Sequence, residues 1–279
     1  MLTVCSLLMR TVGVGFNVYI TGVLGAGGVG LFSLITSAYG FFSTFALSGV
    51  NLAASKLCAE GIGHECADEV RGVMKRCLAY SLCFGGCATL LMLALSYPIG
   101  VCLIGDAGSV RSLRILAPSL LPLSLSSGIY GYLHAVRRVG KSAVLQIGEQ
   151  LARILFTVLL FRTLMPSGAP EACALVSLGI TFSELIAFSV GIIIFYRDIT
   201  QHLPPQGIRL PGLTRRMLSI SLPMALSSYM RSGLLTLEHM LIPSGLRRFG
   251  SGSEGALEQY GILHGMAFPV ILYPQVLLA

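Results

Sequence analysis

The stretch AVLQIGEQLARILFTVLLFRTLM (residues 143–165) decides the fold class of this chain. It is apolar and long enough to cross a bilayer as a helix, which takes about 20 residues. Four of its polar residues, Gln146, Glu149, Gln150 and Arg153, have a spacing that places them on one helical face. A charge at the bilayer centre costs at least about 2.5–3.5 kcal/mol, so such residues usually face a bundle interior or a water-filled cavity. The stretch therefore predicts a membrane-spanning helix with a polar face turned inward.

Composition supports the same class for the whole chain. The 279 residues have a mean hydropathy of +0.80, and only 11% of them are charged, whereas a soluble domain carries about 25%. The net charge of +7 does not indicate nucleic-acid binding, because basic residues of membrane proteins collect in cytoplasmic loops. The eight cysteines lie mostly in apolar stretches and lack the partners of a metal site. We expect an all-α integral membrane protein.

Eight hydrophobic segments are predicted as transmembrane helices: 2–24, 30–56, 77–104, 112–135, 143–165, 171–196, 213–243 and 259–279. The Pro- and Gly-rich residues 201–212 read as a cytoplasmic linker between two units. Residues 1–200 then form a six-helix lobe, and residues 213–279 form the start of a second lobe. Because the sequence stops within an apolar run, we expect that second lobe to be incomplete.

The basic residues of the loops predict the orientation. Eleven Lys and Arg residues lie in the loops after spans two, four and six, and five lie in the loops on the opposite side. Basic loops stay in the cytoplasm, so we expect a cell-membrane protein with a cytoplasmic N-terminus. The mixed-charge segment 59–76 is predicted to form a short surface helix in the first of these loops.

Charged residues inside the other spans are candidate site residues. Arg10 shares one side of span one with Asn17, and Asn51 belongs to a track of small polar residues on span two. Glu184 lies alone in span six, and span seven holds Arg231, Glu238 and His239. These positions read as cavity residues or as possible ion-coupling groups.

Structural interpretations remain open for the same residues. Glu149 and Arg153 suit an i,i+4 pair with no further role, and Arg10 suits a side chain that extends to the interface. The small residues of spans one and two are also typical of helix packing. Glu184 fits a hydrogen bond to a neighbouring helix, and His239 fits the outer interface.

Five stretches resemble the multidrug/oligosaccharidyl-lipid/polysaccharide flippase superfamily. They are Arg10 to Gly25 followed by GVGLFSL (28–34), ALSGVNLAASKLCAE (46–60), GYLHAVRRVG (131–140), QIGEQLAR (146–153) and QYGILHGMAFP (259–269). None is a catalytic signature, but their order and spacing cover nearly the whole chain. The likeness is greatest to the stage V sporulation protein B branch of polysaccharide biosynthesis proteins, which is related to the lipid II flippases.

The resemblance implies two six-helix lobes that rock around a central cavity and move polyprenyl-pyrophosphate-linked saccharides across the membrane. It implies that Arg10, Lys56 and Arg231 bind the pyrophosphate, whose charge suits arginine and lysine. Glutamates such as Glu149, Glu184 and Glu238 then pair with these residues or couple transport to Na⁺ or H⁺. No cofactor or metal is expected. Partners are the lipid-linked saccharide, membrane lipids and possible cell-envelope biosynthesis proteins, in sporulation among other settings.

Three rival hypotheses remain. A cation-coupled multidrug antiporter of the same superfamily needs cavity carboxylates, which Glu149 and Glu184 supply. An incomplete second lobe fits an inactive scaffold. A membrane enzyme that handles a metal–diphosphate needs paired carboxylates in an aqueous loop. Asp106 and Asp198 stand apart in the sequence, so we do not expect an enzyme.

Overall fold

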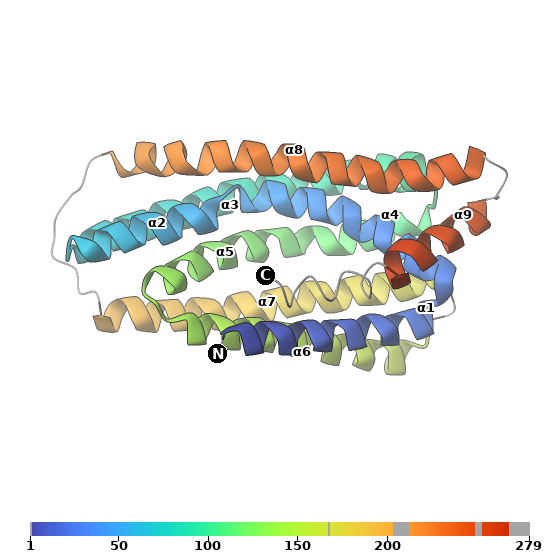
Figure 1. Ribbon diagram of the computed structural model, residues 1–279, viewed down its shortest axis with the longest axis horizontal. Helices are drawn as coiled ribbons and strands as arrows, with labels where there is room; N and C mark the ends of the chain where they lie inside the picture. Colours follow the sequence, from blue (N-terminus) through green and yellow to red (C-terminus); the bar gives the residue numbers. More distant parts are fainter. Residues whose placement is uncertain (1, 167, 203–211, 249–252, 268–279) are drawn as a thin grey trace.

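The structure, a computed structural model, describes residues 2–166, 168–202, 212–248 and 253–267. For some residues in these ranges, Arg10 among them, it describes the backbone and not the side chain. All regular elements of the described residues are helical. They are α1 (Leu2–Leu47), α2 (Val50–Gly63), α3 (Ala67–Pro98), η1 (Ile99–Ile104), α4 (Gly108–Leu116), η2 (Ala117–Ser119), α5 (Leu120–Ala135), α6 (Val139–Leu164), α7 (Ala169–His202), α8 (Leu213–Arg248), α9 (Ser253–Tyr260) and η3 (Gly261–Ala267). Most of the long helices run along one common axis (Figure 1).

The α1 element contains the first predicted span and most of the second, whose last residues lie in α2. A straight helix over its 46 residues would be about 70 Å long, more than twice the thickness of the hydrocarbon core. Gly25 interrupts it with φ 69° and ψ 174°, a backbone conformation that favours glycine. The second half returns alongside the first, as Figure 1 shows at the right-hand end. The prediction of two spans in this region is confirmed.

The predicted surface helix over residues 59–76 is wrong. Helix α2 continues to Gly63, and α3 begins at Ala67 after a tight turn. Val70, Val73 and Met74 at the start of α3 are buried in an apolar cluster that includes residues of α2 and α5. Because this apolar contact extends beyond the predicted span ends, the segment forms the last turns of α2 and the first turns of α3.

The remaining predicted spans appear as helices with shifted boundaries. Four described helical stretches are long and apolar enough to cross a membrane: Thr11–Gly63, Ala67–Ile104, Val139–Leu164 and Ala169–His202. The fourth predicted span is divided into α4, η2 and α5, and Pro118 is the middle residue of η2. The seventh corresponds to α8, and the eighth is described only as far as Ala267.

The loops after spans two and four lie at the same end of the bundle, on the left in Figure 1, where α7 ends and α8 begins. The bend of α1 and the links from η1 to α4 and from α6 to α7 lie at the other end. This alternation agrees with the predicted order of spans. Most of the predicted linker falls outside the described residues.

Two glycines bring α1 into backbone contact with α9 and η3. A Cβ atom on Gly30 would lie 2.1 Å from the carbonyl oxygen of Leu257, and one on Gly261 would lie 2.1 Å from that of Ala26. No side chain fits at either distance. Small residues that let two helices approach closely are a common means of packing in membranes, and here they hold the last described segment against the first helix.

Candidate transport cavity

A cavity of about 390 Å³ lies between the two halves of α1 and helices α6 and α7. Its polar lining consists of Asn17 and Thr36 from α1 and Gln150 and Arg153 from α6. The fold-back of α1 at Gly25 brings Asn17 and Thr36 to the same space. The polar face predicted for span five therefore turns inward at Gln150 and Arg153, whereas Gln146 is exposed.

Arg153 lies between two glutamates. Its Nη2 atom is 2.7 Å from Oε1 of Glu149 on the same helix and 3.5 Å from Oε1 of Glu184 on α7. The exposed fractions of the side chains are 26% for Arg153, 19% for Glu149 and 6% for Glu184. With both carboxylates ionised, this interior triad, as we name Glu149, Arg153 and Glu184, carries one net negative charge.

A second cavity, of about 350 Å³, lies where α1 passes into α2. Its polar lining is formed by Thr44, Asn51, Ser127, Tyr130 and Ser228. Tyr130 of α5 also lies close to the side chain of Glu149. Tyr130 and the interior triad therefore connect the linings of the two cavities.

The backbone break between α1 and α2 shapes the second cavity. Ser48 and Gly49 both have positive φ, 42° and 70°, and Gly49 lines the cavity. The Ser48 hydroxyl donates to the carbonyl oxygen of Phe45 at 2.5 Å. The Tyr229 hydroxyl of α8 also hydrogen-bonds with Ser48 and with the Phe45 carbonyl oxygen. Side-chain hydroxyl groups, one of them from α8, thus form hydrogen bonds with the backbone next to the break.

These linings are suited to a ligand rich in hydroxyl groups. Amide and hydroxyl side chains both donate and accept hydrogen bonds. The Nε atom of Arg153 is buried without a hydrogen-bond partner among the described residues. A buried donor without a partner is costly, so a ligand that accepts from it would gain binding energy.

The structure places the other predicted site residues away from the two cavities or leaves them undescribed. Arg10 belongs to α1, three residues before the cavity residue Gly13, but its side chain lies outside the described part. Lys56 on α2 and Arg231 and Glu238 on α8 are exposed. His239 is half-buried, and its Nδ1 atom is 2.8 Å from the Tyr260 hydroxyl. The roles predicted for these residues stay predictions.

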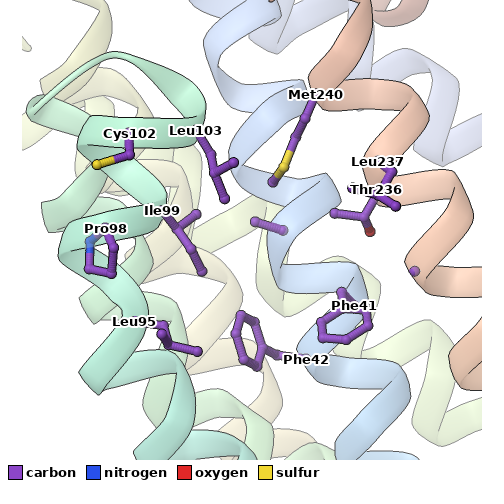
Figure 2. A pocket seen from close by; sticks show the side chains of 12 residues that line it. Phe41, Phe42, Leu95, Pro98, Ile99, Cys102, Leu103, Thr236, Leu237 and Met240 are labelled. Atoms are coloured by element: carbon purple, nitrogen blue, oxygen red, sulfur yellow. The ribbon is translucent and has the colours of Figure 1, made fainter.

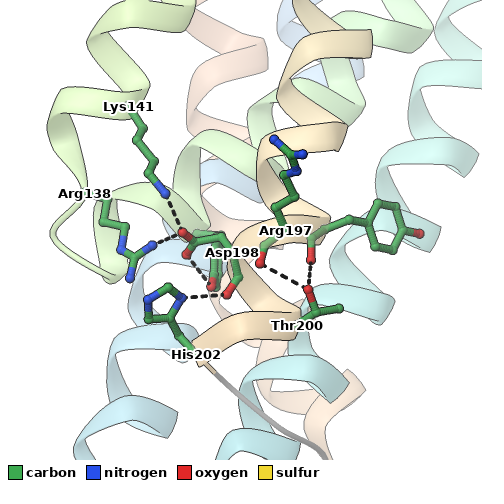
Figure 3. Close-up of polar contacts among 8 residues, drawn as sticks. Arg138, Lys141, Arg197, Asp198, Thr200 and His202 are labelled. Atoms are coloured by element: carbon green, nitrogen blue, oxygen red, sulfur yellow. Dashed lines mark hydrogen bonds and ion pairs between the residues drawn. The ribbon is translucent and has the colours of Figure 1, made fainter.

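A second charged cluster, which sequence reasoning missed, closes the end of the bundle that is predicted to be cytoplasmic. Asp198 near the end of α7 has a fully buried side chain and forms ion pairs with Arg138 and with Lys141, the latter at 2.7 Å. The Tyr132 hydroxyl donates to its other oxygen at 3.1 Å. Figure 3 shows the side chains of Arg138, which directly precedes α6, and of Lys141, in the first turn of α6, both reaching Asp198. We name Arg138, Lys141 and Asp198 the end triad.

A third cavity is apolar and lies between α1, the α3–η1 segment and α8 (Figure 2). Its volume is about 530 Å³. Aromatic and aliphatic side chains line it, among them Phe41, Phe42, Ile99 and Met240, together with Thr236. The Thr236 hydroxyl donates to the carbonyl oxygen of Ser37 at 3.3 Å. The cavity is therefore suited to hydrocarbon and not to a polar group.

The helices and cavities define a multi-pass, all-helical membrane protein with charged and polar groups enclosed between its spans. The sequence profile of the family described as "Polysaccharide biosynthesis protein" matches residues 1–248. The chain belongs to this family, which fits the superfamily predicted from the sequence. It is 23% identical over 278 residues to stage V sporulation protein B of Bacillus subtilis (strain 168), and the match covers 98% of this chain and 54% of that protein. The chain thus spans about half the length of this curated relative.

Solved structures with the same fold are MATE transporters. The structure of MATE in complex with MaD3S superposes with a TM-score of 0.71 at 14% identity, covering 98% of this chain and 60% of that one. The structure of MATE in complex with Br-NRF gives 0.65 at 14% identity, covering 98% and 65%. An inward-facing multidrug resistance MATE family transporter of the MOP superfamily gives 0.63 at 15% identity, covering 96% and 63%. These similarities show the transporter fold.

Proposed function

We propose that this chain translocates a polyprenyl-pyrophosphate-linked oligosaccharide or peptidoglycan precursor across the cell membrane by alternating access. The observation that carries the proposal is the pair of interior cavities lined by amide and hydroxyl side chains in a polysaccharide biosynthesis protein. Such linings offer hydrogen bonds to sugar hydroxyls. Its relative is named for sporulation, so synthesis of the cell or spore envelope is a fitting setting.

In this proposal the sugar contacts Asn17, Asn51 and Gln150, and the pyrophosphate contacts basic residues. Arg10, Lys56 and Arg231 are the basic residues that the family resemblance implies. Arg153 is already paired with two glutamates, so it binds an anion only if a carboxylate of the interior triad is neutralised. Uptake of H⁺ or Na⁺ at the triad would supply that neutralisation, which supports cation-coupled transport.

The orientation belongs to the same proposal. The left end of the bundle in Figure 1 carries the predicted cytoplasmic loops and the end triad, where two cations surround one carboxylate. An excess of basic residues at one end favours the cytoplasmic side. The N-terminus and the connections after spans two, four and six then lie in the cytoplasm.

The test is a flipping assay in proteoliposomes. A fluorescent polyprenyl-pyrophosphate disaccharide is incorporated, and a membrane-impermeant quencher reports the fraction that changes leaflet with time. We expect flipping by the parent chain and its loss in Gln150→Ala and Asn51→Ala. The matched control is Leu151→Ala, because Leu151 adjoins Gln150 but is 56% exposed on the outer surface of α6.

Two outcomes would contradict the proposal. One is that the parent neither binds nor flips the lipid, with binding measured by native mass spectrometry. The other is that both cavity variants flip it as fast as Leu151→Ala does.

A cation-coupled multidrug antiporter is the second candidate. The observation that favours it is the pairing of two carboxylates with one arginine in the interior triad. With both carboxylates ionised, this arrangement suits an organic cation better than a pyrophosphate. The same vesicles distinguish the two candidates when they are loaded with a fluorescent cationic dye. Dye efflux driven by a proton or sodium gradient, without lipid flipping, would favour the antiporter.

A further inference from the structure

Helix α8 begins in an ion-pair cluster against the turn between α2 and α3. The guanidinium of Arg216 is 2.8 Å from Oε2 of Glu60 and 3.1 Å from Oε1 of Glu69. Glu60 lies in the last turn of α2, and Glu69 lies in the first turn of α3. One arginine of α8 thus joins both helices of the α2–α3 hairpin.

The two carboxylates differ in burial. The Glu69 side chain is 6% exposed, and its second oxygen is 3.0 Å from Nδ1 of His64. The side chains of Arg216 and Glu60 are 49% and 34% exposed. Water can therefore replace Glu60 at Arg216 at little cost, whereas Glu69 depends on Arg216 and His64 for its partners. The cluster is able to break and re-form.

An apolar seam lies next to the cluster. Leu213 and Met217 of α8 are buried in the same apolar cluster as Val73 and Cys77 of α3. The Cys77 Sγ atom is 3.6 Å from the Met217 sulfur and the residue is fully buried. Separation of α8 from α3 at this end would therefore expose Cys77 to water.

The cluster joins the two predicted lobes. Helix α8 is the first described element after the predicted linker, and α2 and α3 belong to the predicted first lobe. The contact lies at the end of the bundle that is predicted to be cytoplasmic (Figure 1). In alternating access, contacts between lobes at one end must open when the cavity faces that side.

We propose that Arg216, Glu60 and Glu69 form a latch that holds the cytoplasmic end closed and that opens once in each transport cycle. The latch rests on the proposed function for its cycle, since only a transporter needs to open this end. Its half-exposed members make it weak enough to break, and the buried Glu69 makes re-closure specific for a cation at position 216.

The test uses Cys77 as a reporter of opening. The other seven cysteines are replaced by serine or alanine, and the protein is placed in vesicles whose cytoplasmic face is accessible. The rate of Cys77 labelling by an impermeant maleimide then measures how often the α3–α8 seam opens. We expect Arg216→Gln to raise this rate about fivefold or more, as the loss of one partly exposed ion-pair cluster allows. We expect Arg216→Lys to give a smaller increase.

Two further variants separate a latch from a general loss of stability. Arg215→Gln removes the neighbouring exposed arginine, which is not one of the ion-pair partners of Glu60 and Glu69 in the described structure, and should label at the parent rate. Arg216→Glu combined with Glu60→Arg re-forms an ion pair with opposite polarity and should label more slowly than Arg216→Glu alone.

Two results would overturn the latch. The first is parent-like labelling of Cys77 in Arg216→Gln protein that elutes as a folded species in size-exclusion chromatography. The second is an equal increase in Arg215→Gln. Labelling requires no lipid substrate, so a failure of the latch is distinguishable from a failure of the flipping assay.

Discussion

The interior triad and the end triad are built alike but with opposite charge. In the first, Arg153 lies between Glu149 and Glu184; in the second, Asp198 lies between Arg138 and Lys141. The central residue of the end triad is fully buried, but its two cations are 25% and 45% exposed. In the interior triad none of the three side chains is more than 26% exposed. Water can therefore solvate the surplus charge of the end triad, but it cannot solvate that of the interior triad to the same extent.

This difference indicates different roles. A surplus cation at the membrane surface has a small free-energy cost because water solvates it, and it suits a permanent connection between helices. A surplus ionised carboxylate between the spans has a large desolvation cost unless it binds a cation or a proton. We therefore interpret the end triad as a structural connection between α6 and α7, and the interior triad as the group that changes its charge state during transport.

The largest effect should come from Arg153→Leu. The substitution leaves two carboxylates facing each other between spans, and breaking a buried ion pair in this way costs about 3–5 kcal/mol. We expect a marked fall in the thermal midpoint of the protein in detergent. Adding Glu149→Gln and Glu184→Gln should restore most of the loss, while Arg162→Leu, at an exposed position on the same helix, should change little. An unchanged midpoint in Arg153→Leu would refute the contrast between the triads.

Asp198→Asn should have an intermediate effect. Asparagine keeps an acceptor for the Tyr132 hydroxyl but removes the charge that holds both cations. Because those cations reach water, we expect a destabilisation of about 1–3 kcal/mol, measured as the same thermal midpoint. A loss as large as that of Arg153→Leu would mean that the end triad is as poorly hydrated as the interior one.

Lys141→Gln should cost less than about 1 kcal/mol, because the lysine is nearly half exposed and Arg138 still neutralises Asp198. Arg138→Gln should cost more than Lys141→Gln, since the arginine is the less exposed of the two. Thermal midpoints of the two single variants and the double variant provide the check. A larger loss of stability in Lys141→Gln than in Arg138→Gln would show that the exposure of each cation does not determine its contribution to stability.

Glu184→Gln should have the smallest effect on stability and a large effect on transport. The substitution leaves the short Glu149–Arg153 pair intact and removes the second carboxylate, so the free energy of unfolding should change by less than about 1 kcal/mol. The thermal midpoint should therefore stay close to the parent value. Transport should lose its dependence on a proton or sodium gradient, as measured in the flipping or dye assay with imposed gradients. Retained gradient dependence would exclude the interior triad as the coupling group.

Much of the site was predictable where helical spacing alone places a residue. Gln150 and Arg153 were assigned to an inward face from their spacing, and the structure finds both in a cavity lining. Tyr130 was missed, although Ser127 and Tyr130 are three residues apart on span four and both line the second cavity. Asp198 was treated as isolated because its partners, Arg138 and Lys141, belong to the preceding hairpin and are about 60 residues away in the sequence.

The sequence by itself determined the membrane class, the succession of spans and the family, because apolar length, charge spacing and local motifs are properties of adjacent residues. Only the tertiary structure decided which charges meet. Glu184 joins Arg153 across α6 and α7, and Arg216 reaches two helices from a third. The first pairing depends on how α6 packs against α7, and the second depends on how α8 lies against α2 and α3. Helix packing sets such long-range geometry, and periodicity within a single helix carries no information about it.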